Sequence, residues 1–338
     1  MIPILRWALC GSTAFLSGRA LPGADPRPMA GPTLAFASKR DGDWEIYRAD
    51  APAFRLVRLT RRAPHDRFPV WSPDGSRIAF GVQVSGPAFR WQLWVMNADG
   101  SGQRMLSPSF VAKGGVAWRP DGAEIVFESE RSGNREIVVA RADGSGERNL
   151  SRSEGVDRDP AWSPDGRTIA FRSDRGGNED VYLMGPDGGR LRRLTEAPGV
   201  DGDPAWSPDG TRIAYVCTPD GHRDLCLVQP DGRGHRRLTT DPSDAFHPAW
   251  SPDGTRLAFQ AVRGENYDIE VLEVRSGARN RLTDGAGFDG QLDWSPDGTQ
   301  LALISDRDGS EGLFLLDAAT GAATRLTAEA ALDPDWAP

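Results

Sequence analysis

A short motif built around a tryptophan recurs through almost the whole chain. The motif Trp-Ser-Pro-Asp-Gly, with one weaker copy, begins at Trp71, Trp118, Trp162, Trp206, Trp250 and Trp294. The last five of these copies follow one another at intervals of 44 residues, and a truncated copy lies at Trp336, close to the C-terminus. A fixed period of roughly 40–50 residues indicates a tandem array of supersecondary units. The repeat therefore constrains the fold more strongly than any single motif.

Each unit divides into four short runs that are separated by turn residues. In the unit that begins at Pro160 these runs cover residues 160–163, 168–173, 180–184 and 191–195, with β-branched and aromatic residues at their centres. The Pro-Asp-Gly signal suits a hairpin because proline presets φ and glycine accepts left-handed geometry. No stretch has a sustained apolar period of about 3.6 residues, so we assign almost no helix. Tandem four-stranded antiparallel units predict the blades of a propeller.

The repeat count predicts an all-β protein, a seven-bladed β-propeller. The second-strand signature, as in Ile169-Ala170-Phe171, and the fourth-strand ending Leu-Thr or Leu-Ser each occur seven times. The first unit starts at its second strand, near Thr33, while the C-terminus supplies a lone first strand that ends at Trp336. We expect this C-terminal strand to join the N-terminal blade and close the ring, which removes exposed strand edges. Rings of six or eight blades are the alternatives.

The N-terminal segment has features of an export signal. Arg6 precedes a mostly apolar stretch from Trp7 to Leu16, and small residues near Ala20 could form a cleavage site. We predict a signal peptide at 1–20, a proline-rich linker at 21–32 and the propeller at 33–338; a disordered extension is the alternative. The apolar stretch is too short to span a bilayer. The expected location is periplasmic or secreted.

The repeat resembles the WD40-like propeller repeat of the TolB family, whose pattern is Pro-x-Trp-Ser-Pro-Asp-Gly-x-x-Ile-Ala-Phe. The similarity runs from about Thr33 to Pro338. Because only 32 residues precede this region, the resemblance implies a stand-alone propeller without the N-terminal α/β domain of TolB. Similar repeats occur in exported bacterial binding proteins, in propeller domains of peptidases and in propeller polysaccharide lyases, so the resemblance implies the fold more firmly than the function.

Acidic residues precede most of the repeat tryptophans, in the loops that enter the first strands. Because the first strand should be innermost, we expect these residues to ring the mouth of the central channel. There they could contact a protein or peptide partner, or hold a divalent cation. The alternative is that each aspartate caps its own turn. The predicted channel-mouth residues are Asp66, Asp157, Asp159, Asp201, Asp203, Asp244, His247, Asp289 and Asp333.

Two cysteines, Cys217 and Cys226, fall on the second and third strands of one unit and flank its hairpin. We expect them to face each other across the ladder. In an oxidising compartment they could form a disulfide. Two small buried apolar side chains are an equally open interpretation. Zinc is not predicted, because no second cysteine or histidine pair has ligand spacing.

Composition and motifs favour a binding protein over an enzyme. A net charge of −8 disfavours a nucleic-acid partner, which needs a basic surface. No nucleophile elbow, zincin motif or phosphate loop is present in the sequence. We predict a non-catalytic, monomeric scaffold for a protein or peptide, with no cofactor other than a possible cation at the channel mouth. The alternative is a lyase similar to oligogalacturonate lyases, in which several histidines hold a metal; the candidate histidines here are His65, His222, His235 and His247.

Overall fold

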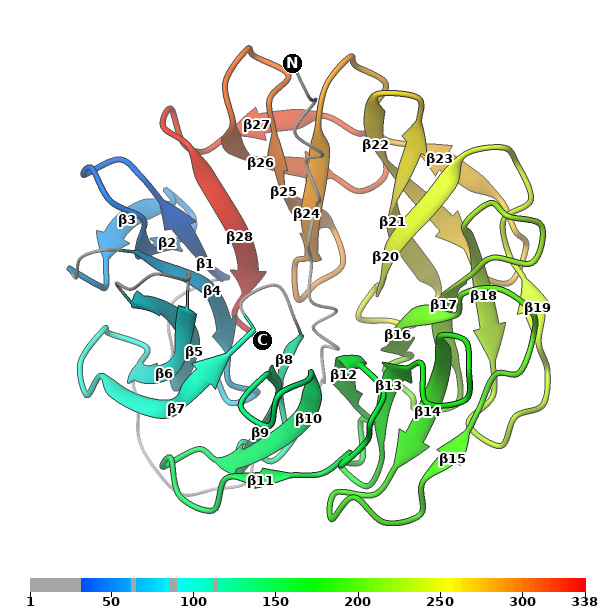
Figure 1. Cartoon of the computed structure of the whole chain (residues 1–338). Helices are drawn as coiled ribbons and strands as arrows, with labels where there is room; N and C mark the ends of the chain where they lie inside the picture. Colours follow the sequence, from blue (N-terminus) through cyan, green and yellow to red (C-terminus); the bar gives the residue numbers. More distant parts are fainter. Residues whose placement is uncertain (1–31, 62–64, 85–89, 112–114) are drawn as a thin grey trace, which may run out of the picture.

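The computed structural model describes residues 32–61, 65–84, 90–111 and 115–338. The predicted signal peptide at 1–20 lies outside the described residues, as does the predicted linker at 21–32 apart from Pro32. Within the described residues, 28 strands form seven four-stranded antiparallel sheets around a central axis (Figure 1). The predicted all-β, seven-bladed propeller is confirmed. The same residues contain no helix with the length and apolar character needed to cross a bilayer.

We number the blades 1 to 7 in chain order and name their strands from the channel outward. Blade 1 contains β28 (Ala331–Trp336), β1 (Thr33–Ser38), β2 (Glu45–Asp50) and β3 (Arg55–Arg58). Blade 2 contains β4 (Asp66–Trp71), β5 (Arg77–Val84), β6 (Arg90–Asn97) and β7 (Arg104–Phe110). Blade 3 contains β8 (Val116–Trp118), β9 (Glu124–Ser129), β10 (Glu136–Arg141) and β11 (Arg148–Asn149). Blade 4 contains β12 (Asp157–Trp162), β13 (Ile169–Ser173), β14 (Asp180–Met184) and β15 (Arg192–Arg193).

The remaining three blades follow the same order. Blade 5 contains β16 (Gly202–Trp206), β17 (Ile213–Cys217), β18 (Asp224–Val228) and β19 (Arg236–Arg237). Blade 6 contains β20 (Asp244–Trp250), β21 (Arg256–Arg263), β22 (Asn266–Glu273) and β23 (Arg279–Arg281). Blade 7 contains β24 (Asp289–Trp294), β25 (Gln300–Ser305), β26 (Gly312–Asp317) and β27 (Ala323–Arg325). The first strand of every blade faces the centre and the fourth lies on the periphery (Figure 1).

The ring closes through the last strand of the chain. β28 pairs antiparallel with β1, with Trp336 opposite Leu34 and Ala331 opposite Ser38. Blade 1 is therefore built from one C-terminal and three N-terminal strands, and the predicted closure is confirmed. Trp336 is fully buried, so the closing strand is part of the core as well as of the ladder.

The repeat tryptophans pack at the interfaces between blades. The indole Nε1 of Trp206 donates a hydrogen bond to the carbonyl of Ala161 at 3.2 Å, and the indole of Trp250 donates to Ala205 at 3.0 Å. Each acceptor belongs to the innermost strand of the preceding blade. In addition, the guanidinium of Arg212, from that preceding blade, lies 5.0 Å from the ring centroid of Trp250. One tryptophan per blade thus joins neighbouring units that could not bury their apolar faces alone.

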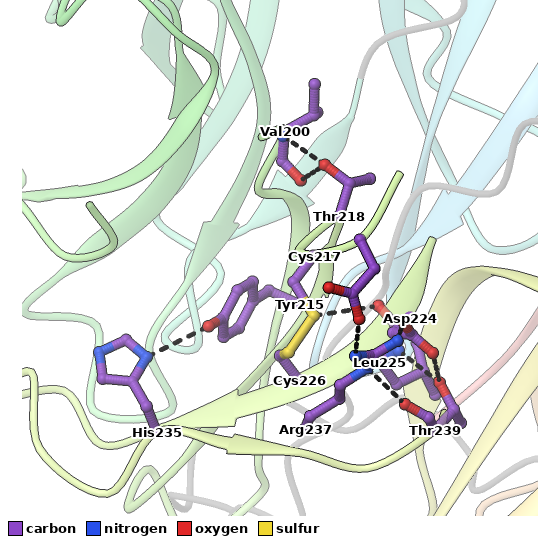
Figure 2. Close-up of a disulfide and its surroundings, with 11 residues drawn as sticks. Val200, Tyr215, Cys217, Thr218, Asp224, Leu225, Cys226, His235, Arg237 and Thr239 are labelled. Atoms are coloured by element: carbon purple, nitrogen blue, oxygen red, sulfur yellow. Dashed lines mark hydrogen bonds and ion pairs between the residues drawn. A yellow bond between two sulfur atoms is a disulfide. The ribbon is translucent and has the colours of Figure 1, made fainter. Parts of the chain in front are cut away.

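The structure joins Cys217 and Cys226 in a disulfide with a Cα–Cα distance of 6.0 Å (Figure 2). Cys217 lies opposite Asp224 in the ladder, and Cys226 lies opposite Tyr215. The cysteines are therefore diagonal neighbours, and their side chains share a face because the two positions differ by two residues. The possible disulfide is confirmed. Both cysteines are buried. The disulfide ties the two middle strands of blade 5 together.

Loss of this disulfide is expected to lower the free energy of unfolding by about 2–3 kcal/mol, because it closes a short loop in the unfolded chain. The sequence separation is 9 residues. The double variant Cys217→Ala/Cys226→Ala should show this loss in urea unfolding. Its midpoint should also no longer change when a strong reductant is added. As a matched control, Val228→Ala removes a buried side chain from the same strand and should leave the response to reductant intact. A wild-type midpoint that ignores complete reduction would contradict the prediction.

Candidate functional site

Six innermost strands carry an irregularity three residues before the repeat tryptophan. In each of them the strand register shifts at this point, as between Arg158 and Ala161 in β12. The residue at this position has a positive φ of 49–59° in six blades, namely Phe68, Asp159, Asp203, His247, Gln291 and Asp333. A non-glycine residue in the left-handed region of φ is strained and persists only where its surroundings hold it. Such strained residues cluster at functional sites. In blade 3 the equivalent residue is Gly115.

Four of the nine predicted residues lie inside the blades instead of at the channel mouth. Asp66, Asp157, Asp201 and Asp289 are all buried. Asp157 accepts two hydrogen bonds from the Arg175 guanidinium, at 2.8 and 2.9 Å. Asp157 therefore holds the β-hairpin of blade 4. Because all four carboxyls are buried, the expectation that they line an open mouth is corrected.

The buried aspartate has an arginine partner in blade 7, as in blade 4, but a threonine partner in blade 5. Asp289 accepts a hydrogen bond from Arg307 at 2.9 Å, the same arrangement as in blade 4. Burial raises the pKa of Asp201 to about 6, although a hydrogen bond from Thr195 opposes the shift.

The other five predicted residues lie nearer the mouth, and each is paired with an opposite charge or a titratable ring. Asp159 lies 3.0 Å from Arg172, and Asp203 lies 3.3 Å from Nδ1 of His247. Asp333 bonds to Arg67 of blade 2 at 3.0 Å. The last pair joins Asp244 to Arg223 at 3.8 Å. Three of these four carboxylates therefore face an arginine, so they do not form an acidic ring without positive partners.

Asp159 and Asp203 form the centre of a titratable cluster that spans blades 3 to 6. Glu128 of β9 accepts a hydrogen bond from the backbone N–H of Asp159 at 2.7 Å, and Asp159 and Asp203 interact through their side chains. Burial and the charge of Asp159 raise the pKa of Glu128 to about 8. Loss of hydration raises the pKa of Asp159 to about 6, although Arg172 opposes the shift. Burial also acts on Asp203, but His247 holds the pKa of Asp203 below its ordinary value.

This cluster can hold and exchange a proton near neutral pH. The surroundings push the pKa values of Glu128, Asp159 and Asp203 apart. Near neutral pH, Asp203 therefore stays ionised while Glu128 stays protonated. Such separation is the physical basis of acid–base pairs in enzymes, but structural networks also produce it. The cluster shows how four blades share hydrogen bonds around the channel.

Replacing Glu128 with glutamine is expected to reduce the loss of stability that the wild type shows as the pH rises. The folded-state pKa of about 8 exceeds the ordinary value, so folding retains a proton that the unfolded chain releases. In the wild type this contribution is present below about pH 4 and is lost between about pH 5 and about pH 8, at up to about 1 kcal/mol per pH unit. Glu128→Gln should show a flatter pH dependence in urea unfolding. Parallel curves for the two proteins would exclude a protonated Glu128.

Several residues of this region were not predicted from the sequence. Phe68 and Gln291 occupy the left-handed position in blades 2 and 7, and reading the third residue before each tryptophan across all repeats would have found them. Arg67, Arg172 and Glu128 lie at positions that carry no repeat signal. Arg67 also lies 4.6 Å from the Phe68 ring centroid and 5.3 Å from that of Trp44. Arg67 thus stacks on two aromatic rings while its guanidinium is paired with Asp333.

The histidines do not converge. His65 accepts a hydrogen bond from the Trp44 backbone, and His235 bonds to the Tyr215 hydroxyl at 3.2 Å (Figure 2). His222 is exposed on the β17–β18 hairpin, and His247 faces Asp203. In the part of the chain that the structure describes, no three His, Cys, Asp or Glu side chains are placed to hold one metal ion.

The family model for the TolB beta-propeller domain matches residues 111–199 and 203–338, which is more than half of the chain. The chain belongs to the TolB beta-propeller family. A 79-residue stretch, 23% of the chain, is 43% identical to the Tol-Pal system protein TolB of Anaeromyxobacter dehalogenans but covers only 17% of that protein.

Solved structures show the same propeller. The crystal structure of TolB from Acinetobacter baumannii superposes with a TM-score of 0.59 at 19% identity, over 93% of this chain and 68% of that one. An oligogalacturonate lyase from Vibrio parahaemolyticus superposes with a TM-score of 0.72 at 15% identity, over 92% of this chain and 89% of the lyase. At these identities the likeness establishes the fold alone.

Proposed function

We propose that this TolB-family propeller is a non-catalytic scaffold that binds a protein or peptide segment at its channel mouth. The observation that carries the proposal is the set of six left-handed, non-glycine residues on the innermost strands. Each of these positions costs about 1–3 kcal/mol of backbone strain, which folding alone gives no reason to repeat six times. The bulges present unlike side chains, Phe, Asp, His and Gln, on a rigid frame. Such variation on a rigid frame suits the recognition of one specific partner.

The proposed partner carries mixed charge. Asp159, Asp244 and Asp333 each already face an arginine, so a strongly basic partner has little net attraction to them. A partner with alternating charges could exchange ion pairs with Asp333–Arg67 and Asp159–Arg172 at little cost. The relatives support this class of function, because their names place them in the Tol-Pal system. If a cation binds here, we propose that it arrives with the partner and bridges the partner to the carboxylates of the mouth.

We also propose that the protein works in an oxidising compartment outside the bacterial cytoplasm. The Cys217–Cys226 disulfide supports this location, because such bonds persist in the periplasm and in secreted proteins. The apolar segment with Arg6 ahead of it, within residues 1–20, supports export. Expression with and without residues 1–20, followed by osmotic-shock fractionation, tests the proposal. Cytoplasmic retention of the full chain would contradict it.

The binding proposal is tested with matched baits. The channel variant carries Asp159→Asn and Asp203→Asn, which remove charge with little change in volume. The control variant carries Asp165→Asn and Asp209→Asn, in the exposed Pro-Asp-Gly turns of the same two blades. Proteins retained from an envelope extract are identified, and the affinity of the purified pair is measured by calorimetry. We expect the channel variant to lose at least about tenfold in affinity, because charge-assisted hydrogen bonds are lost. Equal affinity for both variants would place binding elsewhere.

A further inference from the structure

Two aspartates hold the closing strand β28 between its neighbours. The residue before the repeat tryptophan points toward the following blade, and in five blades it is apolar: Val70, Ala117, Ala161, Ala205 and Ala249. In the two remaining blades it is Asp293 and Asp335. Asp293 accepts a hydrogen bond from the Trp336 backbone N–H at 2.7 Å, and Asp335 accepts one from the Trp71 backbone N–H, also at 2.7 Å. Both interfaces of β28 therefore contain a buried carboxyl that an alanine could not replace.

A second pair of hydrogen bonds joins the same strands at Asp333, three residues before Trp336. The Asp333 N–H donates to the Gln291 side chain at 2.9 Å, and the Asp333 carboxylate accepts from the Phe68 N–H at 3.3 Å. β28 is thus joined to blade 7 and to blade 2 at two levels each. Only its pairing with β1 belongs to its own sheet.

Ionising Asp293 and Asp335 at the same time is energetically unfavourable. Asp293 and Asp335 are each about 4% exposed. Burial and the charge of Asp335 raise the pKa of Asp293 well above its ordinary value, although the N–H groups of Trp336 and Trp294 oppose the shift. Among the other charged groups, Asp333 of β28 itself is paired with Arg67 of β4, and Asp289 of β24 is paired with Arg307. Asp66 of β4 is also buried. Two carboxyls that are buried on either side of the same strand and sense each other's charge favour keeping a proton.

We propose that Asp293 and Asp335 form a proton-dependent clasp that fixes β28, and that loss of its proton loosens the C-terminal strand from blades 7 and 2. In the closed ring the pair holds one proton and both N–H bonds are made. When β28 is released, both carboxyls enter water and that proton dissociates above about pH 4. Closure therefore binds one proton more than release does. Closure is favoured by acid and becomes weaker as the pH rises, until the closed pair itself ionises.

Hydrogen exchange of the intact protein tests the clasp. Protection of residues 331–338 is measured by mass spectrometry from about pH 5 to about pH 9 and corrected for the intrinsic pH dependence of exchange. Residues 213–217 of β17 serve as the internal reference. In the wild type the protection of β28 should fall relative to the reference by up to about tenfold per pH unit. Asp293→Asn keeps an acceptor for Trp336 and needs no proton, so its β28 protection should be flat with pH.

Two further variants separate the proton from the hydrogen bond. Asp335→Asn removes the neighbouring charge but leaves Asp293 buried, so its β28 protection should keep a weaker pH dependence than that of the wild type. Asp293→Ala removes the acceptor, so its β28 should be less protected than that of the wild type at low pH and should also be flat. A wild-type profile parallel to the reference overturns the proposal. Retention of the wild-type pH dependence in both asparagine variants overturns it as well.

Discussion

Removal of residues 331–338 is expected to abolish the cooperative unfolding of the ring. The deletion takes away the innermost strand of blade 1 and exposes the inner edge of β1 (Thr33–Ser38), which otherwise pairs with β28 at Leu34, Ala35, Ala37 and Ser38. It also removes the fully buried Trp336 from the core shared by blades 1 and 7. Opened edges of this length template aggregation. We expect loss of the sigmoidal urea transition, or recovery of the protein only as aggregates.

The matched control for this deletion removes Pro338 alone, which is exposed and lies beyond β28. That variant should unfold at the wild-type urea concentration. If the chain that lacks 331–338 were monomeric and unfolded in one sharp transition near the wild-type midpoint, closure by β28 would not stabilise the ring. Addition of a peptide with the sequence of residues 329–338 gives a second measurement. Partial recovery of the transition is expected, because the missing contacts are local to one strand.

The fold was predictable because one physical signal repeats seven times. Turn chemistry around Pro-Asp-Gly and alternating apolar residues fix four strands per unit, and the incomplete first and last units reveal the closure. Neither inference needs a long-range contact to be known. The disulfide could be proposed but not decided, since the sequence leaves two buried thiols equally open at Cys217 and Cys226.

The sequence predicted which loops carry the candidate residues but not which side chains they pair with. Asp157 and Asp159 are two residues apart, so a regular strand would put both side chains on one face. The bulge between Arg158 and Ala161, with Asp159 in a left-handed conformation, breaks this alternation. Asp157 consequently enters the blade and meets Arg175, while Asp159 turns to Arg172. The partners of such residues depend on the register shift, which the sequence does not reveal.

Replacing Trp294 with alanine is expected to cost about 3–5 kcal/mol of unfolding free energy, the range for a buried tryptophan. Trp294 is fully buried between blades 6 and 7. Its Nε1 donates to the carbonyl of Ala249 at 3.1 Å, and the Arg256 guanidinium lies 4.8 Å from its ring centroid. The substitution removes the packing, the hydrogen bond and the cation–π contact together. Urea unfolding followed by circular dichroism measures the loss.

Two companion variants apportion this loss. Trp294→Phe keeps most of the ring volume but leaves the Ala249 carbonyl without its donor, so it should cost about 1–3 kcal/mol. Arg256→Ala removes the stacked cation and its hydrogen bond to the Gly298 carbonyl, at 2.9 Å, and should cost about 1 kcal/mol. The expected order of loss is Trp294→Ala, then Trp294→Phe, then Arg256→Ala. Equal losses for the two tryptophan variants would show that the hydrogen bond accounts for the lost stability. A negligible loss for Trp294→Phe would show that packing alone accounts for it.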